Sequence, residues 1–160
     1  MIRSVKPSDA KVLVEIYNDY ILNTTISFET EPLTVEQMSH RIEGISAHCP
    51  YLVWEDDGEI AGFCYAHQWK ERAAYHNTLE TTVYLSPRHF RKGIGTQLMK
   101  HLIEDCRKNG FKVLIACITA NNEASIKMHE ALGFKQVSYF SQVGEKFGQL
   151  LDVVDMQLTL

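Results

Sequence analysis

The chain has 160 residues, of which 45% are hydrophobic and 22% charged, which suits one soluble domain covering residues 1–160. The net charge of −4 and the lack of a lysine- and arginine-rich block argue against a nucleic-acid partner. The apolar runs are no longer than strands and the start Met1–Ser4 is polar, so we expect no membrane span and a cytoplasmic location.

The first third of the chain predicts a strand, two helices and a loop between them. Residues 2–5 favour a strand, and Pro7 and Ser8 then begin a helix with apolar residues at spacings of three and four. Residues 23–33 have no period and many hydroxyl groups, which indicates a loop of the kind that often carries specificity. Thr34 to Gln37 match the capping box of a second helix. The apolar face of the first helix consists of Leu13, Ile16, Tyr17, Tyr20 and Ile21.

A hairpin and a further strand follow. Residues 51–55 and 60–66 flank Asp57-Gly58, a strong signal for a two-residue hairpin turn. The polar stretch 68–77 then leads into a predicted strand over 78–85.

The segment Arg88-His89-Phe90-Arg91-Lys92-Gly93-Ile94-Gly95-Thr96 joins that strand to a predicted helix over 97–109. A basic, glycine-rich strand-to-helix turn presents free N–H groups and a positive helix end, which favour an anion such as phosphate. A nucleoside-triphosphate loop is excluded because Lys92 precedes both glycines. A dinucleotide fingerprint is excluded because Leu98 stands where a third glycine is needed. A solvated turn without a ligand stays the alternative.

The last third completes an α+β pattern. The helix over 97–109 carries an apolar stripe and ends at Gly110, and residues 111–118 read as a buried strand. A helix over 122–132 ends at Gly133, and two strands, 137–143 and 149–158, flank a 144–148 loop. We therefore expect a mixed, largely antiparallel sheet with helices on both faces and one parallel pair spanning the phosphate loop.

Two motifs resemble the GNAT-type N-acetyltransferase superfamily. They are the Arg/Lys-x-Gly-x-Gly turn and, about two dozen residues later, the block Asn122 to Phe134. Further segments are similar to the phosphinothricin acetyltransferase branch of that superfamily: Phe28–Thr34, Trp69–Tyr75, Leu79–Leu85 and Gln142–Gly148. The resemblance implies a GNAT-like fold in which the parallel strand pair splays, with acetyl-coenzyme A as co-substrate and a homodimer as the assembly.

The resemblance also implies the cofactor-binding residues. The loop amides would hold the pyrophosphate, the edge of the 78–85 strand would pair with the pantetheine, and a main-chain N–H there would polarise the thioester. Phe90 departs from the glutamine or arginine usual in the family. The implied residues are Val83, Tyr84, Leu85, Arg91, Lys92, Gly93, Ile94, Gly95, Thr96 and Asn122.

Glu80 is the candidate base for removing a proton from the amine. An acid within a buried strand is costly unless it has a partner or a function, and burial raises its pKa toward a useful value. The phosphinothricin-type branch has a glutamate at the matching position. The alternative is a structural salt bridge, for instance with Arg72.

His129 is the second catalytic candidate, since an imidazole can give a proton to sulfur or help to deprotonate the amine. Helical spacing puts it on one face with Asn122 and Ile126. A separate stripe is predicted to pack on the sheet: Ala124, Met128, Ala131 and Leu132. A structural role for a lone histidine is the alternative.

Substrate recognition is expected from the loops. Lys70, Arg72 and Tyr75 can bind an acidic small molecule, with Arg72 forming a fork to a carboxylate or phosphinate. Phe28 and Glu29 would line the opposite wall, where Glu29 would attract an ammonium group. Thr82, on the Glu80 side of its strand, is added to this set. Simple solvation is the alternative for each. The four cysteines lack metal-binding spacing with the histidines, so no metal is expected.

These residues are compatible with three functions. The leading one is an acetyl-coenzyme A-dependent N-acetyltransferase acting on the α-amine of a small amino-acid-like substrate, of the phosphinothricin or methionine sulfoximine type. The second is acetylation of a protein or peptide amine by the same chemistry. The third is a non-catalytic coenzyme A-binding module, for which an intact candidate base and acid would be superfluous.

Overall fold

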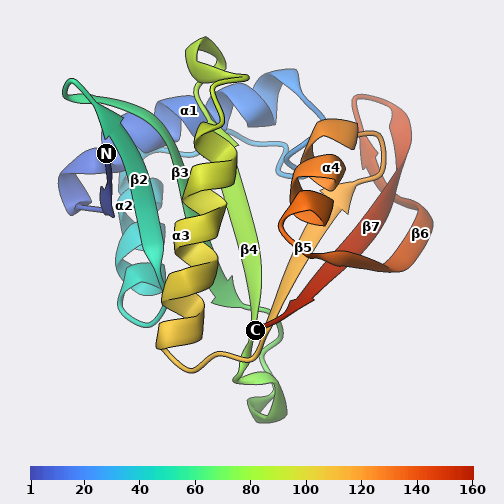
Figure 1. Cartoon of the computed structure of the whole chain (residues 1–160). Helices are drawn as coiled ribbons and strands as arrows, with labels where there is room; N and C mark the ends of the chain where they lie inside the picture. Colours follow the sequence, from blue (N-terminus) through green and yellow to red (C-terminus); the bar gives the residue numbers. More distant parts are fainter.

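A computed structural model describes all 160 residues. Seven strands form one sheet in the order β1-β2-β3-β4-β5-β7-β6, and four α-helices accompany it (Figure 1). The strands are β1 (Ile2–Ser4), β2 (Tyr51–Asp56), β3 (Glu59–Gln68), β4 (Thr78–Leu85), β5 (Val113–Thr119), β6 (Lys135–Lys146) and β7 (Gln149–Thr159). The helices are α1 (Ala10–Asn23), α2 (Val35–Ser46), α3 (Ile94–Lys108) and α4 (Glu123–Ala131), with short 3-10 turns at Pro7–Asp9, Ala73–Tyr75 and Pro87–His89.

Two hydrophobic cores lie on opposite faces of the sheet, as the prediction of helices on both faces requires. One core combines α1 and α2 with β2 and β3, and includes Leu13, Ile42 and Phe63. The other combines α3 with β3, β4, β5 and β7, and includes Leu98 and Leu114. Figure 1 shows α3 and α4 in front of the sheet and α1 and α2 behind it. None of the helices combines the length and apolar character needed to cross a bilayer.

Local sequence signals explain several boundaries. The capping box of α2 is present: the Gln37 N–H donates to the Thr34 hydroxyl (3.1 Å), and the Thr34 N–H donates to the Gln37 side chain (2.9 Å). Asp57 and Gly58 have φ values of 47° and 80°, as a two-residue hairpin turn between β2 and β3 requires. Both predictions are confirmed.

The parallel pair separates part-way along its length. β4 pairs with β5 only at residues 78–80, opposite 113–115, whereas β5 continues alongside β7 to Thr119. The upper part of β4 keeps only β3 as a neighbour, and Figure 1 shows β4 and β5 diverging from their common lower end. The splay expected from the family resemblance is therefore present, and it opens the sheet at its centre.

Two predicted boundaries were wrong. The helix after the basic loop begins at Ile94, not at residue 97, because Gly93 adopts a left-handed φ of 74° and starts the helix directly. β6 runs to Lys146, and only Phe147 and Gly148 form the turn to β7, with φ values of 53° and 71°. Phenylalanine is unusual at the first position of such a turn, so the sequence around Phe147 does not predict a two-residue hairpin.

The predicted faces of α4 also need correction. Ala124 and Ala131 are exposed, whereas Ile126, Met128 and Leu132 pack against the core. α4 lies at the rim of the opening between β4 and β5, and its larger apolar side chains, not its alanines, cover the sheet. Ile126 consequently packs inward and does not share a ligand-facing surface with His129.

Candidate active site

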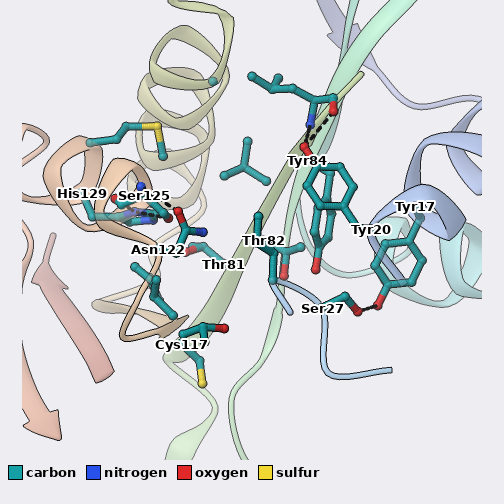
Figure 2. A pocket seen from close by; sticks show the side chains of 18 of the residues that line it. Tyr17, Tyr20, Ser27, Thr81, Thr82, Tyr84, Cys117, Asn122, Ser125 and His129 are labelled. Atoms are coloured by element: carbon teal, nitrogen blue, oxygen red, sulfur yellow. Dashed lines mark hydrogen bonds between the residues drawn. The ribbon is translucent and has the colours of Figure 1, made fainter. Parts of the chain in front are cut away.

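A cavity of about 820 Å³ lies where β4 and β5 separate, a size typical of small-ligand sites. Its walls come from α1, α2, the 23–33 loop, β3, β4, β5, β7, the basic loop and α4. Figure 2 shows Asn122, Ser125 and His129 on one side of β4, and Tyr17, Tyr20 and Ser27 on the other. The splay thus makes one space that is lined by residues from both faces of the sheet.

The basic loop has unpaired main-chain donors at one end of this cavity. None of the six N–H groups from Arg91 to Thr96 makes an intramolecular hydrogen bond, and the first that does, that of Gln97, donates to the Gly93 carbonyl. Arg91 and Gly95 line the cavity, and Arg91 has a left-handed φ of 62°. The donors lie at the start of the 15-residue helix α3, where the helix dipole also favours an anion. These donors are therefore free for a ligand, and a solvated turn without a ligand stays the alternative.

The predicted loop residues differ in what they can offer. Arg91 and Lys92 are exposed, so their charges are screened, and Thr96 is partly buried. The Ile94 side chain is only 5% exposed and lies in the core, so Ile94 can contribute only its N–H group. Lys92, Gly93, Ile94 and Thr96 do not line the cavity itself, whereas Phe90 does.

Main-chain groups of β4 alternate in direction. The Ser86 N–H donates to Ala61 O (2.9 Å) across the β3–β4 pair. The N–H and C=O groups of successive residues point to opposite sides of a strand. Those of Tyr84 therefore point toward β3, and those of Val83 point into the opening. The expectation that Tyr84 supplies edge groups is therefore wrong, although its ring lines the cavity.

Leu85 also faces the opening, but its main chain is already bound. The Tyr20 hydroxyl donates to the Leu85 carbonyl (2.8 Å) and accepts from the Leu85 N–H (3.3 Å). Val83 lies beyond the last β4–β5 pair and keeps its edge groups free of a strand partner. Of the three predicted edge residues, Val83 is thus the one with an available N–H group in the opening.

Glu80 is half-buried in the wall of the cavity. Its carboxylate lies 4.0 Å from Nε2 of His67, the residue directly opposite on β3. Burial raises the pKa of Glu80, the positive form of His67 opposes that shift, and Asp155 adds to it. The alternative partner Arg72 makes no ion pair with Glu80, so that salt bridge is absent. A half-buried carboxyl with a raised pKa suits a general base.

His129 is 3% exposed and lies against the cavity. Its Nδ1 is 2.8 Å from the Ser125 carbonyl, which can only accept, so Nδ1 carries the hydrogen and Nε2 keeps a lone pair. Burial lowers the pKa of His129, and the bond to Ser125 partly offsets this. The resting imidazole is therefore neutral and an acceptor at Nε2. It can protonate a thiolate only after it has itself taken up a proton.

Asn122 caps the start of α4. Its side-chain oxygen accepts a hydrogen bond from the Ser125 N–H (3.2 Å) at the start of α4, and its side chain lines the cavity. Its amide nitrogen makes no hydrogen bond in the structure. A ligand in the cavity can use that donor.

The 23–33 loop forms the wall expected from Phe28 and Glu29, both of which line the cavity. Glu29, however, accepts two hydrogen bonds from Arg41 (2.8 and 2.5 Å) and one from the Tyr17 hydroxyl. The Arg41 guanidinium is the main cause of the lowered pKa of Glu29. Because its charge is already balanced, Glu29 is poorly suited to attract a substrate ammonium group, contrary to the expectation.

Distant residues hold this loop in place. The buried Lys146 ammonium donates to the Ser27 carbonyl (2.6 Å), and the Thr119 hydroxyl donates to the Thr25 carbonyl (3.0 Å). The contact between 27 and 146 spans 119 residues of sequence. No local pattern predicts this contact, so the role of Lys146 could not be recognised from the sequence.

Three predicted substrate residues lie outside the cavity lining. Lys70, Arg72 and Tyr75 are in the connection between β3 and β4, and Lys70 stacks over the rings of Trp69 (4.2 Å) and Tyr75 (5.5 Å). Arg72 makes no side-chain hydrogen bond or ion pair. Thr82, by contrast, lines the cavity as expected.

Other residues of the cavity were not identified from the sequence. Tyr17 and Tyr20 were predicted only as core residues, because the helical pattern does not reveal that their hydroxyl groups reach the opening. His67 was missed because the nine-residue connection from β3 to β4 does not specify the strand register. The remaining polar residues missed in the lining are Ser27, Arg41, Tyr65, Thr81, Cys117, Thr119 and Ser125. No group of three or more histidine, cysteine, aspartate or glutamate side chains has a metal-binding arrangement.

Comparison with known proteins decides the family. Residues 2–154 match the family described as the acetyltransferase (GNAT) domain. This chain belongs to the GNAT acetyltransferase family. The fold thus has the family origin that the sequence resemblance implied.

Relatives of this GNAT chain include two kinds of small-molecule acetyltransferase. Phosphinothricin N-acetyltransferase of Streptomyces viridochromogenes is 39% identical, over 95% of this chain and 83% of the relative. L-methionine sulfoximine/L-methionine sulfone acetyltransferase of Salmonella typhimurium is 34% identical, over 99% and 94%.

A solved relative contains the cofactor. The GNAT superfamily phosphinothricin acetyltransferase of Sinorhizobium meliloti, determined in complex with acetyl-coenzyme A, superposes with a TM-score of 0.97. It is 34% identical, and the match covers 100% of this chain and 88% of that one.

Proposed function

We propose that this GNAT chain is an acetyl-coenzyme A-dependent N-acetyltransferase for the α-amine of a small amino-acid-like substrate, of the phosphinothricin or methionine sulfoximine type. The observation that carries the proposal is the single cavity that brings unpaired loop amides, Glu80 and His129 together. The named activities of the relatives support the same substrate class.

The cofactor positions follow from the available donors. The N–H groups of residues 91–96 hold the pyrophosphate, with Arg91 and Lys92 adding positive charge. Val83 pairs with the pantetheine along the β4 edge, and its N–H polarises the thioester carbonyl. The free amide nitrogen of Asn122 adds one further donor.

Glu80 and His129 each accept one of the two protons that the substrate must lose. Acetyl-coenzyme A supplies the acetyl group as a thioester, and an ammonium substrate must lose two protons to become an amide. Glu80 removes one of them. His129 takes the other at Nε2 and passes it to the departing sulfur, which makes use of its neutral resting state. Side chains thus cover both transfers, and the proposed reaction uses no metal.

A small substrate is favoured over a protein or peptide. Ile26, Ser27, Phe28 and Glu29 close one wall of the cavity, and Lys146 ties that wall to β6. A peptide would need an open groove there. The runner-up function, acetylation of a protein amine, therefore has less support.

Arg72 is proposed to bind the substrate carboxylate or phosphinate, because its guanidinium has no partner within the protein and lies in the connection that follows His67. Replacing Arg72 with alanine is expected to raise the KM for the amino-acid substrate about tenfold, since a charge-assisted hydrogen bond contributes roughly 1.5–3 kcal/mol. The KM for acetyl-coenzyme A should not change. Steady-state kinetics with each substrate varied separately measures both, and Arg107→Ala, on the outer surface of α3, is the control. An unchanged KM for the amine would remove Arg72 from the site.

The function itself is tested by thiol release. The protein is mixed with acetyl-coenzyme A and a panel containing phosphinothricin, methionine sulfoximine, methionine sulfone and peptides. Release with the small amines supports the proposal, whereas release with peptides alone supports the runner-up. Folded protein that binds the cofactor but releases thiol with none of them would instead be a non-catalytic binding module.

A homodimer is proposed through the edge of the sheet that β6 forms. β6 has no neighbour on its outer side, and this region carries six large apolar side chains that are about half or more exposed. An exposed apolar edge of this kind favours pairing with a second copy. The six side chains are Val137, Tyr139, Phe140, Val143, Phe147 and Leu150.

Val143→Lys is expected to weaken such a dimer about a hundred-fold, because it brings unpaired charge into an apolar interface. Sedimentation velocity over a concentration series measures the change. Leu22→Lys, an equally exposed position on α1, is the control and should sediment like the parent. A monomeric parent at micromolar concentration would contradict the dimer.

We also propose that the chain acts as one cytoplasmic domain without a nucleic-acid or membrane partner.

A further inference from the structure

His67 connects the proposed base to the outside of the protein. It lies directly across the β3–β4 pair from Glu80, with its Nε2 4.0 Å from the Glu80 carboxylate. The His67 side chain is 37% exposed and that of Glu80 is 31% exposed, and both line the cavity. The imidazole therefore reaches both the active-site carboxyl and solvent.

A main-chain contact fixes the tautomer of His67. Its Nδ1 is 2.9 Å from the Gln68 carbonyl, which can only accept a hydrogen bond, so Nδ1 carries the hydrogen. The neutral ring then keeps its lone pair on Nε2, the atom nearest Glu80. His67 is thus arranged as a proton acceptor for the Glu80 carboxyl group.

No other neighbour of Glu80 suits this role. The titratable groups that face it are His67 and Tyr65 from β3, Cys117 from β5 and Asp155 from β7. Burial raises the pKa of Cys117 to about 12 and also raises that of Tyr65, so both keep their protons at neutral pH. Asp155 opposes the ionisation of Glu80 through its own negative charge. His67 offers a free lone pair at Nε2, the atom nearest the Glu80 carboxylate.

We propose that His67 is the exit for the proton that Glu80 takes from the substrate. The Glu80 O–H bond breaks and an N–H bond forms at Nε2 of His67, which restores the carboxylate. The imidazolium then gives this proton to water. One bridging water molecule or a small side-chain rotation closes the 4.0 Å gap. The proposal rests on the proposed function, in which each acetyl transfer releases one net proton.

The test is the pH dependence of kcat/KM for the parent, His67→Gln, Glu80→Gln and the control His101→Gln. His101 is also an exposed histidine whose Nδ1 contacts a carbonyl, but it lies on α3. We expect His67→Gln to lower kcat/KM about tenfold near neutral pH, a part of what general acid–base catalysis provides. Added imidazole should restore activity in His67→Gln but not in Glu80→Gln. The KM for acetyl-coenzyme A should stay unchanged.

The pH profile of kcat/KM should also shift in His67→Gln. Without the positive charge of His67, the pKa of Glu80 is raised further, so the acidic limb of the His67→Gln profile shifts to higher pH. A purely structural histidine would produce neither this shift nor the rescue by imidazole. His67→Asn is the second variant, with circular dichroism to confirm that each variant is folded.

The outcomes distinguish the role of His67 as proton exit from the role of Glu80 as base. If Glu80→Gln is inactive and both His67 variants match the parent at every pH, the proton exit is wrong and the proposed function stands. If Glu80→Gln retains the activity of the parent, Glu80 is not the base, and both the base assignment and the exit are overturned.

Discussion

Replacing Glu80 with glutamine is expected to lower kcat/KM by a hundred-fold or more, the range in which general bases contribute. Glutamine has nearly the same shape but cannot accept the amine proton. The acidic limb of the pH profile, which reports the raised pKa of Glu80 in the parent, should be lost as well. Thiol-release kinetics across pH 5–9 measures both effects.

The Glu80 variant has a matched control and a second readout. Glu104→Gln removes an exposed carboxylate of α3 that pairs with Arg107, and its activity should equal that of the parent. Acetyl-coenzyme A should bind Glu80→Gln with unchanged affinity, because the proposed pyrophosphate contacts lie at residues 91–96. An active Glu80→Gln enzyme with a normal acidic limb would contradict the assignment.

Glu80→Gln should also be more stable than the parent at neutral pH. Because the folded-state pKa of Glu80 is raised, the folded protein gives up this proton less readily than the unfolded chain does. The parent's free energy of unfolding therefore falls as the pH rises from the unfolded pKa, about 4.3, through the folded value. Thermal melts should show the advantage of the variant at pH 8 and its loss near pH 4.

Replacing Gly95 with valine is expected to weaken acetyl-coenzyme A binding by about ten- to a hundred-fold. A Cβ at Gly95 would already lie 3.4 Å from the Leu85 side chain and 3.5 Å from the Met128 sulfur, and Gly95 itself lines the cavity. The extra methyl groups must push on Leu85 or enter the proposed cofactor path, and such overpacking costs roughly 1–3 kcal/mol. Isothermal titration with coenzyme A measures the affinity.

Gly44 provides the comparison for this substitution. It lies in α2, and a Cβ there would meet nothing within 4 Å. Gly44→Val should bind coenzyme A as the parent does. Parent-like affinity of Gly95→Val, with the fold verified by circular dichroism, would show that the cofactor does not pass between the basic loop and β4.

The sequence predicted the parts of the site that depend on local chemistry. Gly93 and Gly95 after a strand predicted a turn with free N–H groups, and the period of the following helix placed this turn at a helix start. The alternation along β4 put Glu80 and Thr82 on one side of the strand, and both line the cavity. These features need only neighbouring residues, so they could be recognised without coordinates.

Features that depend on packing between distant segments could not be predicted. The Tyr20 hydroxyl on Leu85, Arg41 on Glu29 and Lys146 on Ser27 each join residues from separate elements. The tautomer of His129 could not be predicted either, because the Ser125 carbonyl determines which ring nitrogen carries the hydrogen. The sequence therefore identified His129 but not its neutral, accepting state.

The measurement that tests the account most directly is a crystal structure of the complex with coenzyme A and a substrate amine. We predict that the pyrophosphate oxygens lie within hydrogen-bond distance of the N–H groups of residues 91–96. We also predict that the sulfur lies in the cavity between the Glu80 carboxylate and Nε2 of His129. A cofactor bound with its pyrophosphate away from that loop, or with its sulfur outside this cavity, would contradict the account.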